Sequence, residues 1–145
     1  MAAPATLDTI RSDFELLDDW EDRYRYLIEL ARGLSPLEPD QRTDANKVRG
    51  CASQVWLATR TLGGPEGPSI EIHGDSDAHI VKGLIAVLLA LYGGRPAADI
   101  LRTDAHKVFA ELGLAEHLTP QRSNGFAAMV ARVRADAEAA LAQAA

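Results

Sequence analysis

Cys51 is the residue of this sequence best suited to covalent chemistry, because it is the only cysteine among the 145 residues. Its neighbours within the segment 48–56 are small, which would let a partner molecule approach the sulfur closely: Gly50, Ala52 and Ser53. Two nearby cations, Lys47 and Arg49, would favour the thiolate, which is the nucleophilic form of the thiol. The alternative is a free cysteine that packs as a small hydrophobic side chain.

A single thiol excludes several kinds of sulfur chemistry. It cannot close an internal disulfide, form a CxxC redox pair or supply the several thiolates of a zinc or iron–sulfur site. A cysteine hydrolase would also need a base, and four histidines are available for that role: His73, His79, His106 and His117. None of them lies in a motif that predicts contact with Cys51, and no protease-type signature surrounds the cysteine. A self-contained cysteine hydrolase is therefore disfavoured.

A cluster of histidines and aspartates at 73–79 (HGDSDAH) allows two interpretations. Asp75, Asp77 and His79 are acceptable metal ligands, but their spacing matches no specific metal-binding loop. Asp75, Ser76 and Asp77 are also residues that satisfy the unpaired amides at the N-terminus of a helix. We therefore expect a helix cap here rather than a metal site.

Arg122, in the segment LTPQRSNG at 118–125, is a further candidate. Its guanidinium group could bind a carboxylate or an acidic group of a partner through two parallel hydrogen bonds. The alternative is a solvated arginine in a loop that precedes a helix. The two tryptophans, Trp20 and Trp56, are expected in the core rather than on a contact surface.

Composition describes the protein that would carry these residues. Hydrophobic residues make up 47% and charged residues 25% of the chain, which is typical of a soluble globular protein, and the length suits a single domain at 1–145. The net charge of −6 argues against nucleic acid as a main partner. The apolar run at 83–94 is too short to span a membrane, and the first six residues do not resemble a signal peptide. We therefore expect a cytoplasmic protein that binds neither nucleic acid nor membrane.

The first half of the chain changes its periodicity from helical to strand-like. Helical spacing of apolar residues predicts an amphipathic helix at 6–17 and a second at 20–34, capped by Asp18 or Asp19. Alternation of apolar and polar residues predicts strands at 54–62 and 69–73, joined by a Gly/Pro-rich turn into an antiparallel hairpin. The residues at 47–50 are a candidate for a third short strand.

Helical spacing then returns, and each segment has its own start and stop signals. The segments are a helix that begins after 75–77 and ends at Gly93 and Gly94, a short helix at 96–101, a helix between Thr103 and Gly113, and an Ala-rich helix after Ser123. Thr119 and Pro120 are expected in the loop before the last helix. This order predicts an α+β fold in which helices flank a small three-stranded antiparallel sheet.

Four stretches closely resemble the SufE family, the sulfur-acceptor (cysteine desulfuration) proteins of the SUF pathway of iron–sulfur cluster assembly. They occur in the order found in the family and cover nearly the whole domain: WEDRYRYLIELARGL at 20–34, RGCASQVW at 49–56, GDSDAHIVKGLIAVLLALY at 74–92 and HLTPQRSNGFAAM at 117–129. The resemblance implies a fold similar to the SufE proteins and to the cluster scaffold IscU.

The resemblance also implies a chemical role for Cys51. A cysteine desulfurase of the SufS type, which uses pyridoxal phosphate, would hold sulfur as a persulfide on its own cysteine. Cys51 would take up that sulfur by thiol exchange, stimulate the desulfurase and deliver the sulfur to a SufBCD-like scaffold complex. This chain would then need no cofactor and no metal of its own. An apolar loop environment would shield the persulfide from solvent.

Four further residues lie in the matching stretches and are expected to shape the docking surface for the partner: Arg122, Gln54, Asp75 and Asp77. Three alternatives stay open beside the SUF acceptor. One is a CsdE-like acceptor that serves a paralogous desulfurase. The others are a metal- or cluster-binding scaffold, which would need several thiolates, and a binding module whose cysteine is inert.

Overall fold

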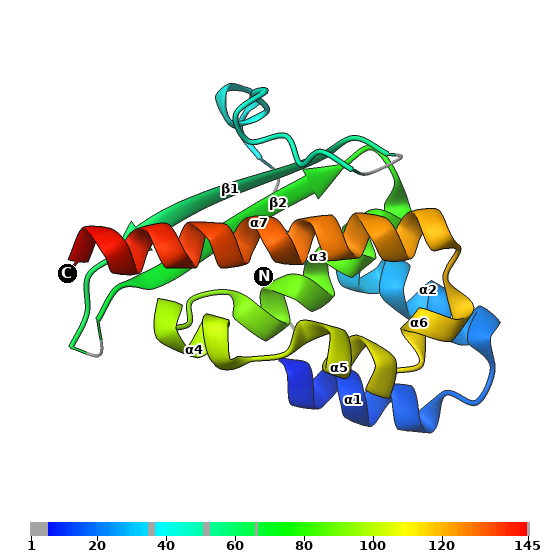
Figure 1. Cartoon of the computed structure of the whole chain (residues 1–145). Coiled ribbons are helices and arrows are strands. Elements are labelled where there is room, and N and C mark those ends of the chain that lie inside the picture. The colour runs from blue at the N-terminus through cyan, green and yellow to red at the C-terminus, as the bar shows by residue number, and fades with distance from the viewer. Residues whose placement is uncertain (1–5, 35–36, 51–52, 66, 145) are drawn as a thin grey trace.

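The computed structural model describes residues 6–34, 37–50, 53–65 and 67–144. Its elements are α1 (Leu7–Leu16), α2 (Trp20–Ala31), the 3-10 turn η1 (Pro39–Gln41), β1 (Val55–Leu62), β2 (Ser69–Ser76), α3 (His79–Tyr92), α4 (Ala97–Arg102), α5 (Ala105–Glu111), α6 (Leu114–His117) and α7 (Pro120–Ala144). Figure 1 shows the long α7 running alongside the two strands, with the shorter helices gathered on its other side. The predicted α+β class is confirmed.

The described sheet has two strands, so the prediction of three is wrong. β1 and β2 pair in antiparallel fashion from Val55 opposite Ser76 to Leu62 opposite Ser69. The expected third strand is reduced to one bridge between Lys47 and Trp56. A turn precedes Lys47, and Gly50 adopts a left-handed conformation with φ of 92°, so the extended segment between them is too short to form a strand.

β2 continues to Ser76, beyond the predicted end at residue 73. Gly74 is needed for close packing rather than for a stop, because a Cβ there would lie 2.7 Å from Ile85 Cγ2 and 2.8 Å from Leu57 Cδ2. The expected cap of α3 by Asp75, Ser76 or Asp77 is wrong, because β2 extends through Asp75 and Ser76 and the helix begins at His79. The N-cap residue is Ala78, which has no side-chain cap, and its N–H donates to Ser76 Oγ at 3.2 Å.

Two other helix starts differ from the predictions. α7 begins at Pro120, because proline suits the first helical position and Thr119 Oγ1 accepts a hydrogen bond from the Arg122 N–H at 3.3 Å. The predicted loop at Thr119–Pro120 is thus the start of the helix. α5 is capped by Asp104 instead of Thr103, and its carboxylate accepts a hydrogen bond from the Lys107 N–H at 3.1 Å.

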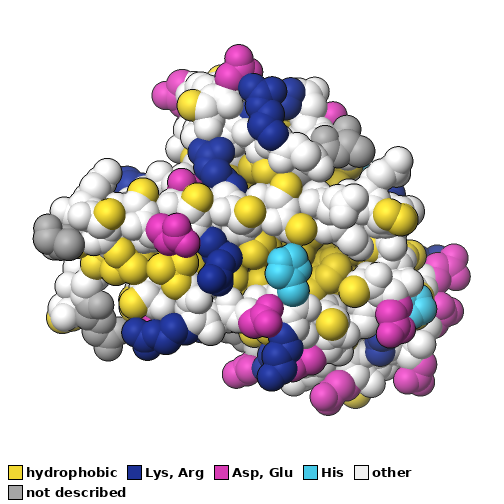
Figure 2. Space-filling model, viewed as in Figure 1, with side chains coloured by type: hydrophobic (Ala, Val, Ile, Leu, Met, Phe, Trp, Pro, Cys, Tyr) yellow, Lys and Arg dark blue, Asp and Glu magenta, His cyan; other side chains and the backbone are white. Residues whose placement is uncertain are grey.

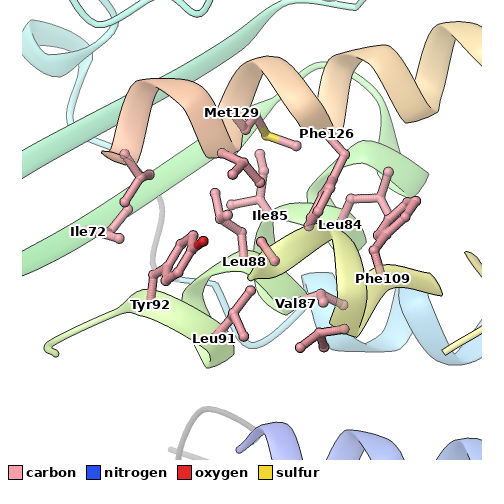
Figure 3. Close-up of a cluster of buried hydrophobic side chains, with 14 of the residues drawn as sticks. Ile72, Leu84, Ile85, Val87, Leu88, Leu91, Tyr92, Phe109, Phe126 and Met129 are labelled. Carbon is pink, nitrogen blue, oxygen red and sulfur yellow. The ribbon is translucent and has the colours of Figure 1, made fainter. Parts of the chain in front are cut away.

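The core lies between the sheet and the helices and is centred on α3. Figure 3 shows side chains of this helix, among them Leu84, Ile85 and Leu88, pointing toward Phe126 and Met129 of α7. Apolar side chains on the inward face of the sheet join the same cluster: Val55, Leu57, Ile70 and Ile72. Within the described residues, no helix combines the length and the apolar character that crossing a bilayer would require.

Candidate functional site

Cys51 and Ala52 lie outside the described residues, and the site is defined by the segments that lead to and from them. The Val48 N–H donates to the Val55 carbonyl at 2.8 Å, which closes the segment 49–54 at its base. On the entering side, a Cβ on Gly50 would lie 3.4 Å from Ala128 Cβ of α7. The segment that carries the cysteine is therefore anchored to β1 and begins beside α7.

Gln54, on the leaving side of this segment, is held by the end of β2. Its N–H donates to Asp77 Oδ1 at 3.0 Å. Its carbonyl accepts from Ser76 Oγ at 2.7 Å and from the Asp77 N–H at 3.3 Å. We call these contacts the Gln54 clamp. The structure thus brings together Gln54 and Asp77, two of the residues selected from the sequence, and adds Ser76.

Asp75 has a different set of partners. Its side chain is only 9% exposed and forms ion pairs with Arg42 and, at 3.4 Å, with Lys82. It also accepts a hydrogen bond from the Ser76 N–H at 2.8 Å. Asp75 therefore joins the segment before the cysteine, the sheet and α3. Its expected contact with a partner stays a prediction.

A small cavity of about 20 Å³ lies beside Ser53, between α3 and α7. Its apolar wall consists of Val81, Leu84, Phe126 and Met129, and its remaining lining is Ser53, Gln121, Arg122 and Gly125. A space of this size holds about one water molecule or one atom of similar size. The cavity brings Arg122 next to the cysteine segment, although about seventy residues of sequence separate them.

A much larger cavity of about 600 Å³ lies along α7, beside α4 and α5. Figure 2 shows apolar side chains at the bottom of this furrow. It is lined by residues of α3, α4, α5 and α7. Of the residues selected from the sequence, His106 belongs to it, whereas Gln54, Asp75, Asp77 and Arg122 do not. Cavity volume alone would therefore place the functional site away from the cysteine segment.

The histidine–aspartate cluster at 73–79 is spread out by the fold. His73 Nε2 lies 3.0 Å from Glu71 Oε1, whereas Asp75 and Asp77 contact the groups named above. Among the described residues, no group of three or more histidine, cysteine, aspartate or glutamate side chains is arranged to hold a metal ion. His117 stacks on Trp20, with ring centroids 4.0 Å apart.

Sequence reasoning missed three residues that support the site. Arg42 and Lys82 neutralise Asp75, and Ser76 holds the carbonyl of Gln54. Arg42 and Asp75 are 33 positions apart, so no local spacing could have revealed their contact. Trp56, expected in the core, is only half-buried, and the Arg42 guanidinium lies 5.6 Å from its ring centroid.

The fold and the site together define an α+β protein in which the residues that flank a single cysteine are anchored to the end of a small sheet. Comparison with known proteins identifies the family: the model "SufE: Fe-S metabolism associated domain" matches residues 8–137. This chain belongs to the SufE family, and the resemblance noted in the sequence is confirmed.

Individual relatives agree with this assignment. An uncharacterized SufE-like protein of Rhizobium etli is 56% identical, over 92% of this chain and 90% of the relative. Another from Rhizobium meliloti is 50% identical, over 94% of this chain and 97% of the relative. The solution structure of a hypothetical protein from Thermus thermophilus is similar with a TM-score of 0.75 and 23% identity, over 97% of this chain and 99% of the other. That likeness concerns the fold alone.

Proposed function

We propose that this protein is a sulfur acceptor and carrier in which Cys51 takes up persulfide sulfur from a pyridoxal-phosphate-dependent cysteine desulfurase of the SufS type. Membership of a family associated with iron–sulfur metabolism supports this role. The observation that carries it is the location of the two residues that follow Ala52: Ser53 lines the same cavity as Arg122, and Gln54 is held by Ser76 and Asp77. A reducing compartment such as the cytoplasm would keep the single thiol free.

The transfer step is a thiol exchange at sulfur. The Cys51 thiolate attacks the terminal sulfur of the desulfurase persulfide, and a new S–S bond forms as the old one breaks. The electron pair of the broken bond leaves on the desulfurase cysteine as a thiolate, which takes up a proton. Cys51 then carries the persulfide, and no external oxidant or reductant is consumed.

The side chains around the segment suit this exchange. The cationic Arg122 favours an anionic sulfur species near the cavity by Coulomb attraction. The apolar wall of Val81, Leu84, Phe126 and Met129 limits access of water and oxidants to a sulfur atom held there. The Gln54 clamp fixes the end of the segment that leads into β1. At the other end, the left-handed conformation of Gly50 sets the direction of the chain.

The loaded protein would pass its sulfur to a scaffold complex of the SufBCD type, and its uptake of sulfur would stimulate the desulfurase by clearing its persulfide. No cofactor of this chain takes part in the proposal, because pyridoxal phosphate belongs to the desulfurase. A CsdE-like acceptor would use the same chemistry with a paralogous desulfurase.

A stimulation assay tests the proposal. Alanine release from cysteine is measured with SufS-type and paralogous desulfurases, with and without this protein. We expect severalfold stimulation by the wild type with its proper desulfurase and none by Cys51→Ser. Full stimulation by Cys51→Ser, or none by the wild type with any desulfurase, would contradict the proposal.

A further inference from the structure

The outward face of the β1–β2 sheet carries a group of cations around a tryptophan. The apolar positions that pack on the core are Val55, Leu57, Ile70 and Ile72, so the alternate positions point away from it. These include Trp56 and Arg60 of β1, with Lys47 bridged to Trp56. Arg42 and Lys82 adjoin this face through Asp75. We call Arg42, Lys47, Trp56, Arg60 and Lys82 the cationic sheet face.

The acids on this face are each shared by two basic side chains. Asp75 contacts Arg42 and Lys82, and Glu71 contacts Arg60 at 3.2 Å and His73 at 3.0 Å. The hydrogen bonds from His73 and Arg60 hold the pKa of Glu71 below its ordinary value of 4.5, so this carboxyl group is ionised at neutral pH.

The two arginines are also more exposed than the acids. The Arg42 and Arg60 side chains are 45% and 69% exposed, whereas those of Asp75 and Glu71 are 9% and 34% exposed. By count, four cationic side chains oppose two carboxylates, so the face is positive. A partner that approaches it meets the two guanidinium groups first.

This positive face contrasts with the chain as a whole, whose net charge is −6. Figure 2 shows acidic side chains gathered over the end of the molecule that contains α1 and α5. Such a charge separation orients the molecule as it approaches a charged partner. An acidic patch on a protein can meet this face alone, whereas the length of a nucleic acid or the extent of an anionic membrane would also bring its charges against the acidic remainder. This difference favours an acidic protein surface as the partner of the face.

The face is continuous with the base of the cysteine segment. Lys47 and Trp56 are bridged directly beside the hydrogen bond between Val48 and Val55 that closes the segment. A protein bound to the face would therefore lie next to the base of the segment 49–54, which carries Cys51 in the sequence. The Trp56 ring, half-buried under the Arg42 guanidinium, offers a preorganised aromatic contact of the kind enriched at protein interfaces.

We propose that the cationic sheet face binds an acidic surface patch of the cysteine desulfurase, with Trp56 as its aromatic contact. This inference rests on the proposed function and names the part of this chain that the sulfur donor recognises. It adds a docking surface whose charges act on binding, separately from the thiol that accepts the sulfur.

Charge reversal of the face tests the proposal. The double variant Lys47→Glu/Arg60→Glu is compared with Arg25→Glu/Arg32→Glu on α2, which changes the net charge equally at two arginines that are each 74% exposed and each paired to one acid. Binding to the desulfurase is measured by calorimetry at about 0.05 M and 0.5 M salt. We expect the Kd of the first variant to rise at least about tenfold at low salt and that of the control to change less than about twofold.

A neutral variant and thermal melts distinguish lost docking from misfolding. The neutral variant Lys47→Gln/Arg60→Gln should show an intermediate rise in Kd, and thermal melts should show that all variants are folded. Binding of the wild type should itself weaken severalfold from the lower to the higher salt concentration, because salt screens the charges. This measurement needs no variant. Loading of Cys51 from a small polysulfide donor should proceed equally in all variants, because that reaction needs no docking.

The outcomes separate the two proposals. Normal desulfurase binding by the reversed face, or equal weakening by the α2 control, would overturn the docking surface alone. Preferential binding of the wild type to a DNA duplex or to phosphatidylserine vesicles would also overturn it. A wild type that binds the desulfurase through this face without accepting sulfur would contradict the proposed function, and one that neither binds nor accepts sulfur would contradict both.

Discussion

The contact between α2 and α3 and the Gln54 clamp are built in opposite ways. At the helix contact, a Cβ on Gly83 would lie 2.4 Å from the Leu27 carbonyl oxygen, and Leu27 is fully buried. At the clamp, hydrogen bonds hold an exposed residue, Gln54, against Ser76 and Asp77. Two closely packed helices cannot separate slightly without losing their contacts, because even a small gap leaves a void in the core. Hydrogen bonds next to solvent can open one at a time, at a cost of about 1 kcal/mol each. The clamp can therefore open at a much smaller cost in free energy than the helix contact.

The largest expected effect comes from removing the close approach at the helix contact. Gly83→Ala places a methyl group where the Leu27 backbone lies, so α2 must shift away from α3. We expect a loss of about 2 kcal/mol in the free energy of unfolding, because overpacking outweighs the better helix propensity of alanine. Urea denaturation measures it. The control is Gly63→Ala, because no atom lies within 4 Å of the added Cβ. Gly94→Ala is unsuitable, because Gly94 has a positive φ of 74°.

An intermediate effect is expected at Asp75. Asp75→Asn removes the charge that neutralises Arg42 and Lys82 but keeps the shape of the side chain. Because the Arg42 side chain is partly exposed, water partly solvates its charge when the ion pair is lost. We therefore expect the free energy of unfolding to fall by about 1–2 kcal/mol. Thermal and urea unfolding measure the loss. An unchanged stability would show that the ion pairs contribute nothing to the link between the sheet and α3.

Loosening the clamp tests the other side of the comparison. Asp77→Ala leaves the Gln54 N–H without its carboxylate acceptor. A loss of about 1 kcal/mol from the closed segment would raise the rate of Cys51 alkylation by iodoacetamide about fivefold. The matched control is Asp104→Ala, which removes a similar bond from a carboxylate to a backbone N–H, at Lys107 in α5. Equal alkylation rates in the two variants would show that the clamp does not govern access to the cysteine.

The smallest effect is expected from the surface pair on β2. The pKa of Glu71 is held below 4.5 by its hydrogen bonds to His73 and Arg60, so its contribution to stability is present above the unfolded pKa. That contribution is lost as the pH falls through the lower pKa of the folded state. Wild type should therefore be slightly more stable than Glu71→Gln at pH 7, and the two should converge below about pH 4. Urea midpoints across this range measure the difference, and a constant difference would contradict the assignment.

The helices were predictable where one periodic stripe is buried against a neighbour. The buried side chains of α3 follow helical spacing, and the helix ends at Gly93 and Gly94 as predicted. The end of β2 was not predictable, because Gly74 allows close packing between Leu57 and Ile85 and does not end the strand. A glycine has the same appearance in the sequence in either case.

The candidate site was predictable in part. Cys51 stands out because no other thiol competes with it, and the resemblance to the SufE family placed Arg122 in a matching stretch. The Gln54 clamp and the neutralisation of Asp75 by Arg42 depend on how distant segments meet. The periodicity of a sequence describes local structure and carries no information about such contacts.

The most direct test of the account is the mass of the Cys51 peptide after transfer. The protein is mixed with a desulfurase that has turned over once with cysteine, quenched by alkylation and digested. We predict that the Cys51 peptide gains about 32 Da, the mass of one sulfur atom, and that Cys51→Ser gains none. A Cys51 peptide of unchanged mass beside a desulfurase that keeps its persulfide would contradict the assignment of Cys51 as the sulfur acceptor.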